Sequence, residues 1–225
     1  MDDAVLDNPG WASLTGPHAH LAERRGRVAR YPADMSPWHG LDDMSDPLAW
    51  ADAAELAGPG GKITLMGAPD TFPAGWSFHQ GVDGVQMVDD GVSAAPDPDA
   101  MILGPGDVPD ILELVGRTDP GPFEPRTVEM GTYLGFREGG RLIAMAGERL
   151  RPPGWTEISA VCTDPTVRGR GYARRLVHAV VAGIRARGDV PFLHTAAFNT
   201  PAIHLYESMG FKIRRPTRFA SYLTS

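Results

Sequence analysis

The sequence predicts an α/β (α+β) fold, and three observations support this prediction. Trp155–Cys162 is an apolar run typical of a strand, Gly171–Arg187 follows as an amphipathic helix, and a short glycine-containing loop joins the two. The chain also has 225 residues, of which 42% are hydrophobic. That composition allows a sizeable core, either in one enlarged domain or in two small ones of about 100 residues each.

The front of the chain has a weaker pattern. Pro47–Leu56 is predicted to form a short helix, and Lys62–Met66 and Trp76–Val88 are predicted to form strands. Gly81 and Gly84 are expected to interrupt the second strand. No chemical motif stands out in this portion.

Ser93–Asp99 contains two prolines and no apolar periodicity, as is typical of a connector. We therefore place a boundary near residue 96, between an N-terminal subdomain (1–95) and a C-terminal domain (96–225). Residues 1–95 carry 14 acidic and 5 basic groups, net −9, whereas residues 96–225 carry 14 acidic and 16 basic groups, net +2. Because the basic residues cluster locally after residue 167, we expect an anion site and no nucleic-acid surface, which would need a broader basic face.

Behind the connector, each element has a local signal. Met101–Leu103 is expected to form a short strand, and Val108–Val115 has apolar residues at helical spacing. Gly121-Pro122-Phe123 marks a loop. A hairpin then follows, formed by Thr132–Arg137 and Arg141–Arg149 around Glu138-Gly139-Gly140.

The helix Gly171–Arg187 is expected to pack one face on the sheet and to end at Gly188, a plausible C′ residue. Phe192–Ala196 is the next predicted strand. A short helix at Pro201–Met209 has Thr200 as its expected N-cap. The apolar face of the long helix comprises Leu176, Val177, Val180, Val181 and Ile184, and the chain is expected to finish with strands at Phe211–Arg214 and Arg218–Tyr222 after a stop at Gly210.

Composition excludes several classes of protein. The acidic start Met1-Asp2-Asp3 differs from a basic signal-peptide start, and the longest apolar run, Ala179–Ile184, is far below the roughly 20 residues of a membrane span. We therefore expect a cytoplasmic protein without membrane contact. Cys162 is the single cysteine, so an internal disulfide or cysteine-cluster metal site is excluded. The seven histidines show no paired helical spacing, so we expect no metal.

The loop Arg168–Ala173, Arg-Gly-Arg-Gly-Tyr-Ala, opens the long helix. Free N–H groups of a first helical turn and the helix dipole attract anions, and glycines permit a close backbone approach. The loop therefore indicates a diphosphate site. A dinucleotide fingerprint does not fit, because Arg174 stands where a third small residue belongs, and a P-loop would need Gly-Lys-Ser/Thr. A tight turn whose glycines serve packing alone remains the alternative.

Two motifs in residues 100–225 resemble those of the GCN5-related N-acetyltransferase (GNAT) superfamily, and Glu157–Tyr172 looks most like its FR47-type branch. The resemblance implies a mixed, mostly antiparallel sheet with splayed central strands and flanking helices. The first motif is Val161-Cys162-Thr163-Asp164-Pro165 with Arg168-x-x-Gly171-x-Ala173, and the second is Asn199-x-x-Ala202-x-x-x-Tyr206-x-x-x-Gly210-Phe211.

The resemblance implies that the glycine loop binds the pyrophosphate of acetyl-CoA or another acyl-CoA. It further implies that the backbone of Val161–Thr163 binds the pantetheine arm and the thioester carbonyl. Cys162 is expected to be a buried small residue rather than a covalent nucleophile. Whether Arg174 and Arg175 contact phosphates or solvent stays open. The expected cofactor-binding residues are Val161, Cys162, Thr163, Arg168, Gly169, Arg170, Gly171, Tyr172, Ala173, Asn199 and Tyr206.

Acyl transfer to an amine must move two protons, because the amine arrives charged and the departing thiolate takes one up. By resemblance, Glu157 is the candidate base, acting directly or through water, and Tyr206 the candidate acid that protonates the thiolate. The two-residue strand period places Glu157 and Val161 on one strand face. An exposed edge carboxylate and a buried aromatic are the alternative interpretations. Asn199 is expected to contact pantetheine, to cap the helix, or both.

Two functions follow from this resemblance. The first is an N-acetyltransferase in which a primary amine of a small molecule or peptide attacks acetyl-CoA directly in a ternary complex. The second is a non-catalytic acyl-CoA-binding module. Residues 1–95 are a possible degenerate GNAT-like copy without the glycine loop, and their acidity would suit a cationic amine. The chain is expected to be a monomer or homodimer.

Overall fold

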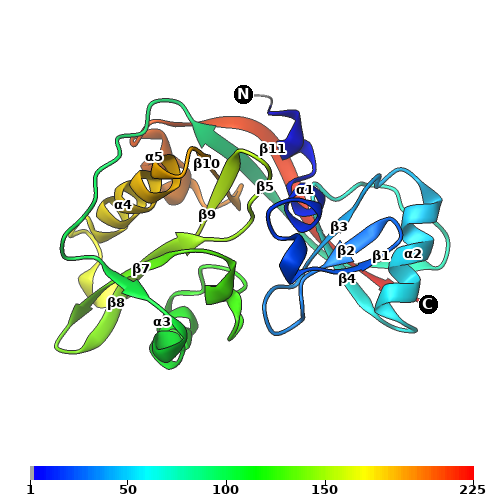
Figure 1. Ribbon diagram of the computed structural model, residues 1–225, viewed down its shortest axis with the longest axis horizontal. Helices are drawn as coiled ribbons and strands as arrows, with labels where there is room; N and C mark the ends of the chain where they lie inside the picture. Colours follow the sequence, from blue (N-terminus) through cyan, green and yellow to red (C-terminus); the bar gives the residue numbers. More distant parts are fainter. Residues whose placement is uncertain (1–2) are drawn as a thin grey trace.

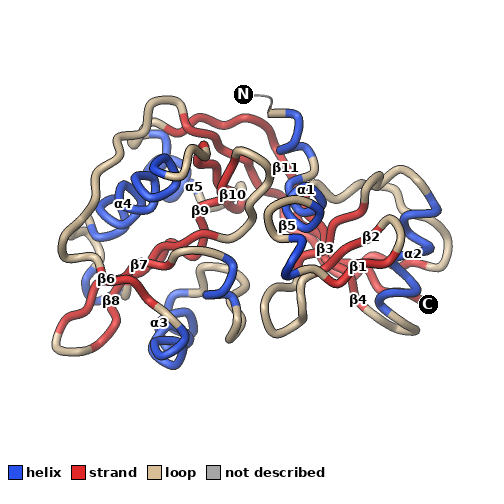
Figure 2. Tube along the Cα trace, in the orientation of Figure 1, coloured by secondary structure: helices blue, strands red, loops and turns tan. Residues whose placement is uncertain are grey.

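A computed structural model describes residues 3–225, whose strands form one sheet of eleven strands (Figures 1 and 2). The strands are β1 (Glu23–Arg25), β2 (Val28–Arg30), β3 (Trp38–Leu41), β4 (Lys62–Met66), β5 (Trp76–Asp89), β6 (Met101–Leu103), β7 (Tyr133–Glu138), β8 (Arg141–Glu148), β9 (Trp155–Thr163), β10 (Val190–Ala196) and β11 (Phe211–Thr224). The α-helices are α1 (Pro9–Thr15), α2 (Pro47–Ala57), α3 (Val108–Thr118), α4 (Tyr172–Ala186) and α5 (Thr200–Glu207). Short 3-10 helices are η1 (Ala4–Asp7), η2 (Ala19–Leu21), η3 (Pro105–Asp107), η4 (Thr127–Met130) and η5 (Pro165–Val167).

The strand order is β1-β2-β3-β4-β11-β5-β10-β9-β8-β7-β6. Two pairs are parallel, β3 with β4 and β9 with β10, and the helices α2 and α4 connect them. The other neighbouring strands pair antiparallel. The structure thus confirms the expected mixed, mostly antiparallel sheet with flanking helices.

The long strands β5 and β11 join the two parts of the molecule. They pair with each other and run side by side across it (Figure 1). β5, from the N-terminal part of the chain, also pairs with β10 of the C-terminal part. β11, from the C-terminal part, pairs with β4 of the N-terminal part. Around this central pair the pairing pattern is palindromic, since β3 and β9 each carry an antiparallel neighbour on the far side.

The connector predicted at Ser93–Asp99 lies between β5 and β6. Its carboxylates bind α4, because the Arg175 guanidinium donates to Asp97 at 2.7 and 2.9 Å and to Asp99 at 2.7 Å. The division into residues 1–95 and 96–225 stays a proposal. The sheet itself continues through both portions, because β5 and β11 are exchanged between them.

Three local predictions need correction. β11 is one strand with a register shift between Ile213 and Arg215, rather than two strands. Asn199, not Thr200, is the N-cap of α5, since its side chain accepts from the Ala202 N–H. β5 is also uninterrupted at its glycines. A Cβ at Gly84 would lie 2.5 Å from the ring of Phe219, so this glycine leaves room for a neighbour rather than breaking the strand.

The central strands splay apart where the sequence resemblance predicts. Pairing between β9 and β10 ends at Ile158 and Leu193, while β10 continues along β5 to Ala196. At the same place β9 carries a bulge against β8, and Ala160 takes the left-handed conformation with φ 54°. A bulge adds a residue to one strand and bends it, so the end of β9 leaves β10 and opens a gap.

Helix α4 packs across β7–β10, and α3 lies on the opposite side of the sheet (Figure 1). All five apolar residues predicted for the inner face of α4 are buried. Burial of each such side chain stabilises the fold by roughly 1.5–3 kcal/mol relative to exposure. The helix ends as predicted, with Gly188 following the C-cap at φ 84°. This packing fixes the first turn of α4 beside the gap between β9 and β10.

Candidate active site

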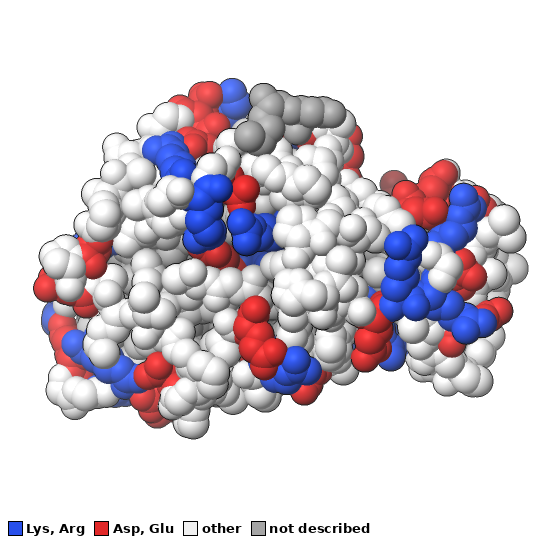
Figure 3. Space-filling view, viewed as in Figure 1, with Lys and Arg blue, Asp and Glu red and all other residues white. Residues whose placement is uncertain are grey.

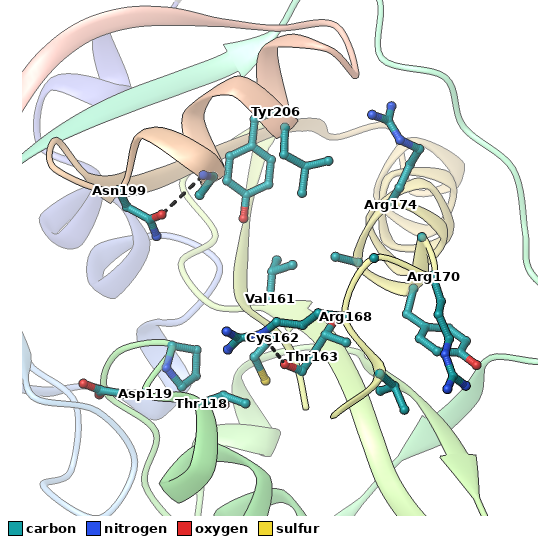
Figure 4. A pocket seen from close by; sticks show the side chains of 18 residues that line it. Thr118, Asp119, Val161, Cys162, Thr163, Arg168, Arg170, Arg174, Asn199 and Tyr206 are labelled. Atoms are coloured by element: carbon teal, nitrogen blue, oxygen red, sulfur yellow. Dashed lines mark hydrogen bonds between the residues drawn. The ribbon is translucent and has the colours of Figure 1, made fainter. Parts of the chain in front are cut away.

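The first turn of α4 faces a cavity of about 510 Å³, here called the glycine-loop cavity (Figure 4). Gly171 is the N-cap of α4, with φ 81° and no side-chain cap. The first N–H groups of the helix therefore lack partners within the helix. A Cβ built on Gly169 or Gly171 meets nothing within 4 Å, so the loop leaves open space in front of these donors. This arrangement fits a phosphate group.

Every cofactor-binding residue predicted from the sequence lines this cavity: Val161, Cys162, Thr163, Arg168, Gly169, Arg170, Gly171, Tyr172, Ala173, Asn199 and Tyr206. Thr163 adds a buried hydroxyl with no hydrogen-bond partner among residues 3–225. An uncapped helix, glycines without neighbours and an unpaired hydroxyl together fit a ligand with phosphate and amide groups.

The arginines of the loop have different partners. Arg168 donates to the Thr163 carbonyl at 3.2 Å. Arg170 pairs with Glu138 at 3.3 Å, and Tyr172 donates to the same carboxylate at 2.6 Å. Arg174 lines the cavity and donates to the Ser208 hydroxyl at 2.7 Å. For Arg175, neither of the two alternatives, contact with phosphates or with solvent, describes the structure. Its guanidinium donates to the connector carboxylates of Asp97 and Asp99.

The Tyr206 hydroxyl points toward Val161 and Cys162 (Figure 4). Burial raises the pKa of Tyr206, so the phenol stays protonated at neutral pH and retains a proton to donate. Asn199 caps α5 through its side-chain oxygen, at 3.3 Å from the Ala202 nitrogen. Burial raises the pKa of Cys162 to about 11, which keeps the thiol neutral and agrees with its interpretation as a buried small residue.

A second cavity of about 490 Å³ adjoins the first and is here called the aromatic cavity. It lies at the splay of β9 and β10, with Ser159 on one wall and Thr195 on the other, and Trp38 and Phe219 also line it. The two cavities share a junction formed by Asp119, Pro120, Val161, Asn199, Ala202 and Tyr206.

Glu157 is fully buried and lines neither cavity. The placement of Glu157 and Val161 on one strand face is wrong, because the bulge at Ala160 inserts a residue. Ile158 and Val161 pack against the same core cluster instead. Glu157 is also no exposed edge carboxylate, since β9 lies between β8 and β10.

The Glu157 carboxylate forms a bidentate ion pair with Arg149, at 2.8 and 2.7 Å. His194 Nδ1 lies 2.7 Å from the same carboxylate. Burial raises the pKa of Glu157, but the Arg149 charge and the hydrogen bonds from Arg149 and His194 outweigh it, so the net pKa lies well below its usual range. Glu157 is therefore a carboxylate with little tendency to take up a proton.

The hydrogen-bond network continues to both exchanged strands. Arg214 of β11 donates to Gln86 Oε1 at 2.9 Å, and Gln86 Nε2 donates to the Leu6 carbonyl at 2.8 Å. The same nitrogen lies 3.0 Å from His194 Nε2, which must accept. His194 therefore carries its proton on Nδ1 and donates it to Glu157. Sequence reasoning missed Arg149, His194 and Asp119, because only the fold brings them to the site.

Charge is mixed on the face of the molecule shown in Figure 3, where basic and acidic side chains alternate. Within residues 3–225, no group of three or more His, Cys, Asp or Glu side chains is placed to hold a metal ion. No helix in the same range is long and apolar enough to cross a membrane.

Comparison with known proteins agrees with this fold. The family described as FR47-like protein matches residues 133–220. A crystal structure of a putative acetyltransferase of the GNAT family from Novosphingobium aromaticivorans is 40% identical, with a TM-score of 0.90 over 99% of this chain and 100% of that one. The chain therefore belongs to the GNAT family, as its sequence motifs predict.

Two curated relatives match only part of their length. N-alpha-acetyltransferase RimI of Mycobacterium tuberculosis is 40% identical over 83 residues, which are 36% of this chain and 51% of that protein. Mycothiol acetyltransferase of Thermomonospora curvata is 35% identical over 98 residues, which are 43% of this chain and 31% of that protein. The chain thus spans about half or less of the curated relatives it matches.

Proposed function

We propose that the chain transfers an acetyl group from acetyl-CoA to a primary amine by direct attack in a ternary complex. The observation that carries the proposal is the junction of two cavities at Tyr206 and Val161. One cavity holds the uncapped end of α4, which suits a diphosphate, and the other leaves room for an acceptor. Two substrates can thus meet at one point without a covalent enzyme intermediate.

In this proposal the glycine loop and Arg168 bind the diphosphate of the donor, and the arm lies along Val161–Thr163. Residues past Ile158 have no partner on β10, so β9 can offer backbone N–H groups to the thioester oxygen. Such donors stabilise the oxyanion that forms in acyl transfer. Asn199, which caps α5, is positioned to contact the pantetheine amide.

The amine nitrogen forms a bond to the thioester carbon, and the carbon–sulfur bond breaks. The ammonium group loses two protons in the whole reaction, of which one goes to the thiolate and one to solvent. Tyr206 is the proposed donor to the thiolate, because its phenol is protonated and faces the junction. Glu157 acts in this scheme by orienting His194 and Arg149 on the wall of the aromatic cavity, since its own carboxylate is engaged.

The Glu157 carboxylate is already bonded to Arg149 and His194, and this observation favours the second candidate, an acyl-CoA-binding module without turnover. Among residues 3–225, neither cavity is lined by a glutamate, so no glutamate base faces the junction. The two functions differ in whether an amine causes release of CoA.

The test is release of free thiol from acetyl-CoA in the presence of amines. Tyr206→Phe should lower kcat by roughly 100-fold, as expected for loss of an acid catalyst. Tyr133→Phe is the matched control, because this tyrosine is also buried and lines neither cavity. Glu157→Gln is measured beside them. Binding of acetyl-CoA without thiol release from any amine would support the binding module instead.

A further inference from the structure

The aromatic cavity contains one unbalanced charge. Besides the neutral phenol of Tyr206, three titratable side chains line it, from Asp119, Arg149 and His194. The Arg149 charge is balanced by Glu157, and His194 donates to the same carboxylate. Asp119 has no such partner: within residues 3–225 its backbone N–H bonds in the last turn of α3, and its carboxylate forms no hydrogen bond or ion pair. The cavity therefore presents a net negative charge to whatever enters it.

Asp119 has a left-handed backbone conformation, which favours glycine. It is the C-cap of α3 and has φ 45° and ψ 59°, the left-handed conformation that glycine adopts without strain. It also lines both cavities, at the junction where the acyl group would be transferred. Strained backbone conformations of non-glycine residues cluster at functional sites. Figure 4 shows the carboxylate pointing away from Tyr206 and the glycine loop, so an ammonium group would reach it from the aromatic cavity.

The other side chains that line the aromatic cavity are mostly apolar, and Ser159, Thr195 and Asn199 add polar groups. The rings of Trp38 and Phe219 lie 5.8 Å apart on its wall. At its edge Phe198 is 77% exposed and Val82 is 43% exposed, although side chains of this size usually gain from burial. An apolar part of the acceptor would cover them. Peptide backbone groups placed against these rings would lose hydrogen bonds to water without replacement.

Resting on the proposed acetyl transfer, we propose that the aromatic cavity binds a small primary amine with an apolar, ring-sized body. Its ammonium group pairs with Asp119, and its body packs against Trp38, Phe219 and Phe198. Trp38 and Asp119 lie outside the residues matched by the FR47-like family, 133–220. Phe198 and Phe219 lie within that match, so the aromatic cavity combines residues of the matched segment with residues outside it.

The test compares four acceptors at fixed acetyl-CoA: 2-phenylethylamine, hexylamine, 1,4-diaminobutane and an alanine-starting tetrapeptide. The expected kcat/KM for 2-phenylethylamine exceeds that for the diamine and for the peptide by about tenfold or more, because burial of a ring is favourable. Phe198→Ser should reduce this advantage without unfolding the protein, since the side chain is exposed.

Asp119→Asn keeps a residue that tolerates the left-handed conformation and removes the charge. It should lower kcat/KM for every amine by about tenfold or more, through KM of the amine, while acetyl-CoA binding stays unchanged. Glu113→Gln is the control on the same helix, because Glu113 pairs with Arg117 and lines neither cavity.

Equal kcat/KM for Asp119→Asn and the wild type, or a preference for the peptide or the diamine, would overturn the acceptor assignment while acetyl transfer itself stands. No thiol release with any of the four acceptors would overturn acetyl transfer to amines, and the acceptor assignment with it. The two failures are therefore distinguishable in one set of assays.

Discussion

The two β–α–β units of the sheet share their connectivity and differ at the loop before the helix. In the C-terminal unit, Gly171 leaves the first turn of α4 uncapped and the loop carries Arg168 and Arg170. In the N-terminal unit, the Asp46 side chain caps α2 at 2.8 Å from the Leu48 nitrogen. Pro47 follows at the first helical position and has no N–H.

The N-terminal loop is acidic and already paired. Asp42 and Asp46 form ion pairs with Arg27. A cavity of about 480 Å³ lies beside this loop, lined by Asp43, Ser45 and Trp50 among others, and the Asp43 carboxylate would repel a phosphate. The two units thus share their connectivity, and the residues of the loop before the helix make only the C-terminal one suited to a phosphate group. A glycine N-cap costs only about a few tenths of a kcal/mol relative to a capping side chain, so Gly171 leaves the N–H donors of α4 free at little loss of helix stability.

The palindromic strand pairing supports the proposal that residues 1–95 are a degenerate copy of the GNAT fold. Each part has a parallel pair of strands joined by a helix and an antiparallel strand on the far side of that pair. Each part also contributes one long strand, β5 or β11, that pairs with the parallel strands of the other part. The duplication remains a proposal, and the acidic loop gives a physical reason why the N-terminal unit would lack the cofactor site proposed for the C-terminal unit.

The largest expected effect concerns the buried ion pair of the C-terminal part. Glu157→Ala should lower the free energy of unfolding by about 3–5 kcal/mol, because it leaves the Arg149 charge buried without a partner. Glu23→Ala breaks an exposed pair with Arg30 across β1 and β2 and should change stability little. Urea unfolding of both variants measures the difference. Equal losses of unfolding free energy would show that burial does not make the Arg149–Glu157 pair more important for stability than the exposed pair.

The N-terminal part should make the protein acid-sensitive. Burial lowers the pKa of His18 and of His39 from 6.5 to about 4. The unfolded chain takes up these protons near pH 6.5 and the folded chain only near pH 4, so stability is highest above pH 6.5 and falls between these values. From pH 7 to pH 5 each histidine should cost about 2 kcal/mol of unfolding free energy.

Replacing both histidines by glutamine should flatten this pH dependence between 6.5 and 4, measured by urea unfolding at several pH values. His20→Gln is the control, since His20 is exposed. An unchanged slope in the double variant would mean that other groups cause the acid sensitivity.

The smallest effects should have opposite signs in the two parts. Ala160→Gly in β9 should stabilise by up to about 1 kcal/mol, because glycine adopts φ 54° without strain. Gly40→Ala in β3 should destabilise by about 1–3 kcal/mol, because its Cβ would lie 2.4 Å from the Trp11 nitrogen. Thermal unfolding of the two variants tests this, and a loss of stability in Ala160→Gly would show that the bulge carries no strain.

The sequence predicted the C-terminal part well because its signals are local. A glycine loop, an amphipathic helix and a capped short helix each occupy a few neighbouring residues. The N-terminal strands β1–β3 were missed because they have three or four residues each, and Glu23–Arg25 is fully charged and exposed. The exchange of β5 and β11 depends on pairing between distant segments, which no local pattern records.

The candidate site also contains residues that local motifs predict and residues that only the fold brings together. The residues predicted to bind the cofactor lie in two short motifs, and all of them line one cavity. The network of Arg149, Glu157 and His194 joins three strands, and the bulge at Ala160 changes which face Glu157 occupies. A strict two-residue period cannot anticipate a bulge.

The central claim is that the C-terminal unit binds acetyl-CoA and the N-terminal unit does not. Isothermal titration of acetyl-CoA measures this directly for the wild type, Gly171→Glu, Gly171→Ala and Ser45→Glu, the last placing the same charge before α2. We expect one site per chain, a loss of affinity of roughly 100-fold in Gly171→Glu, a smaller loss in Gly171→Ala, and no change in Ser45→Glu. Two sites per chain, or unchanged affinity in Gly171→Glu, would contradict the claim.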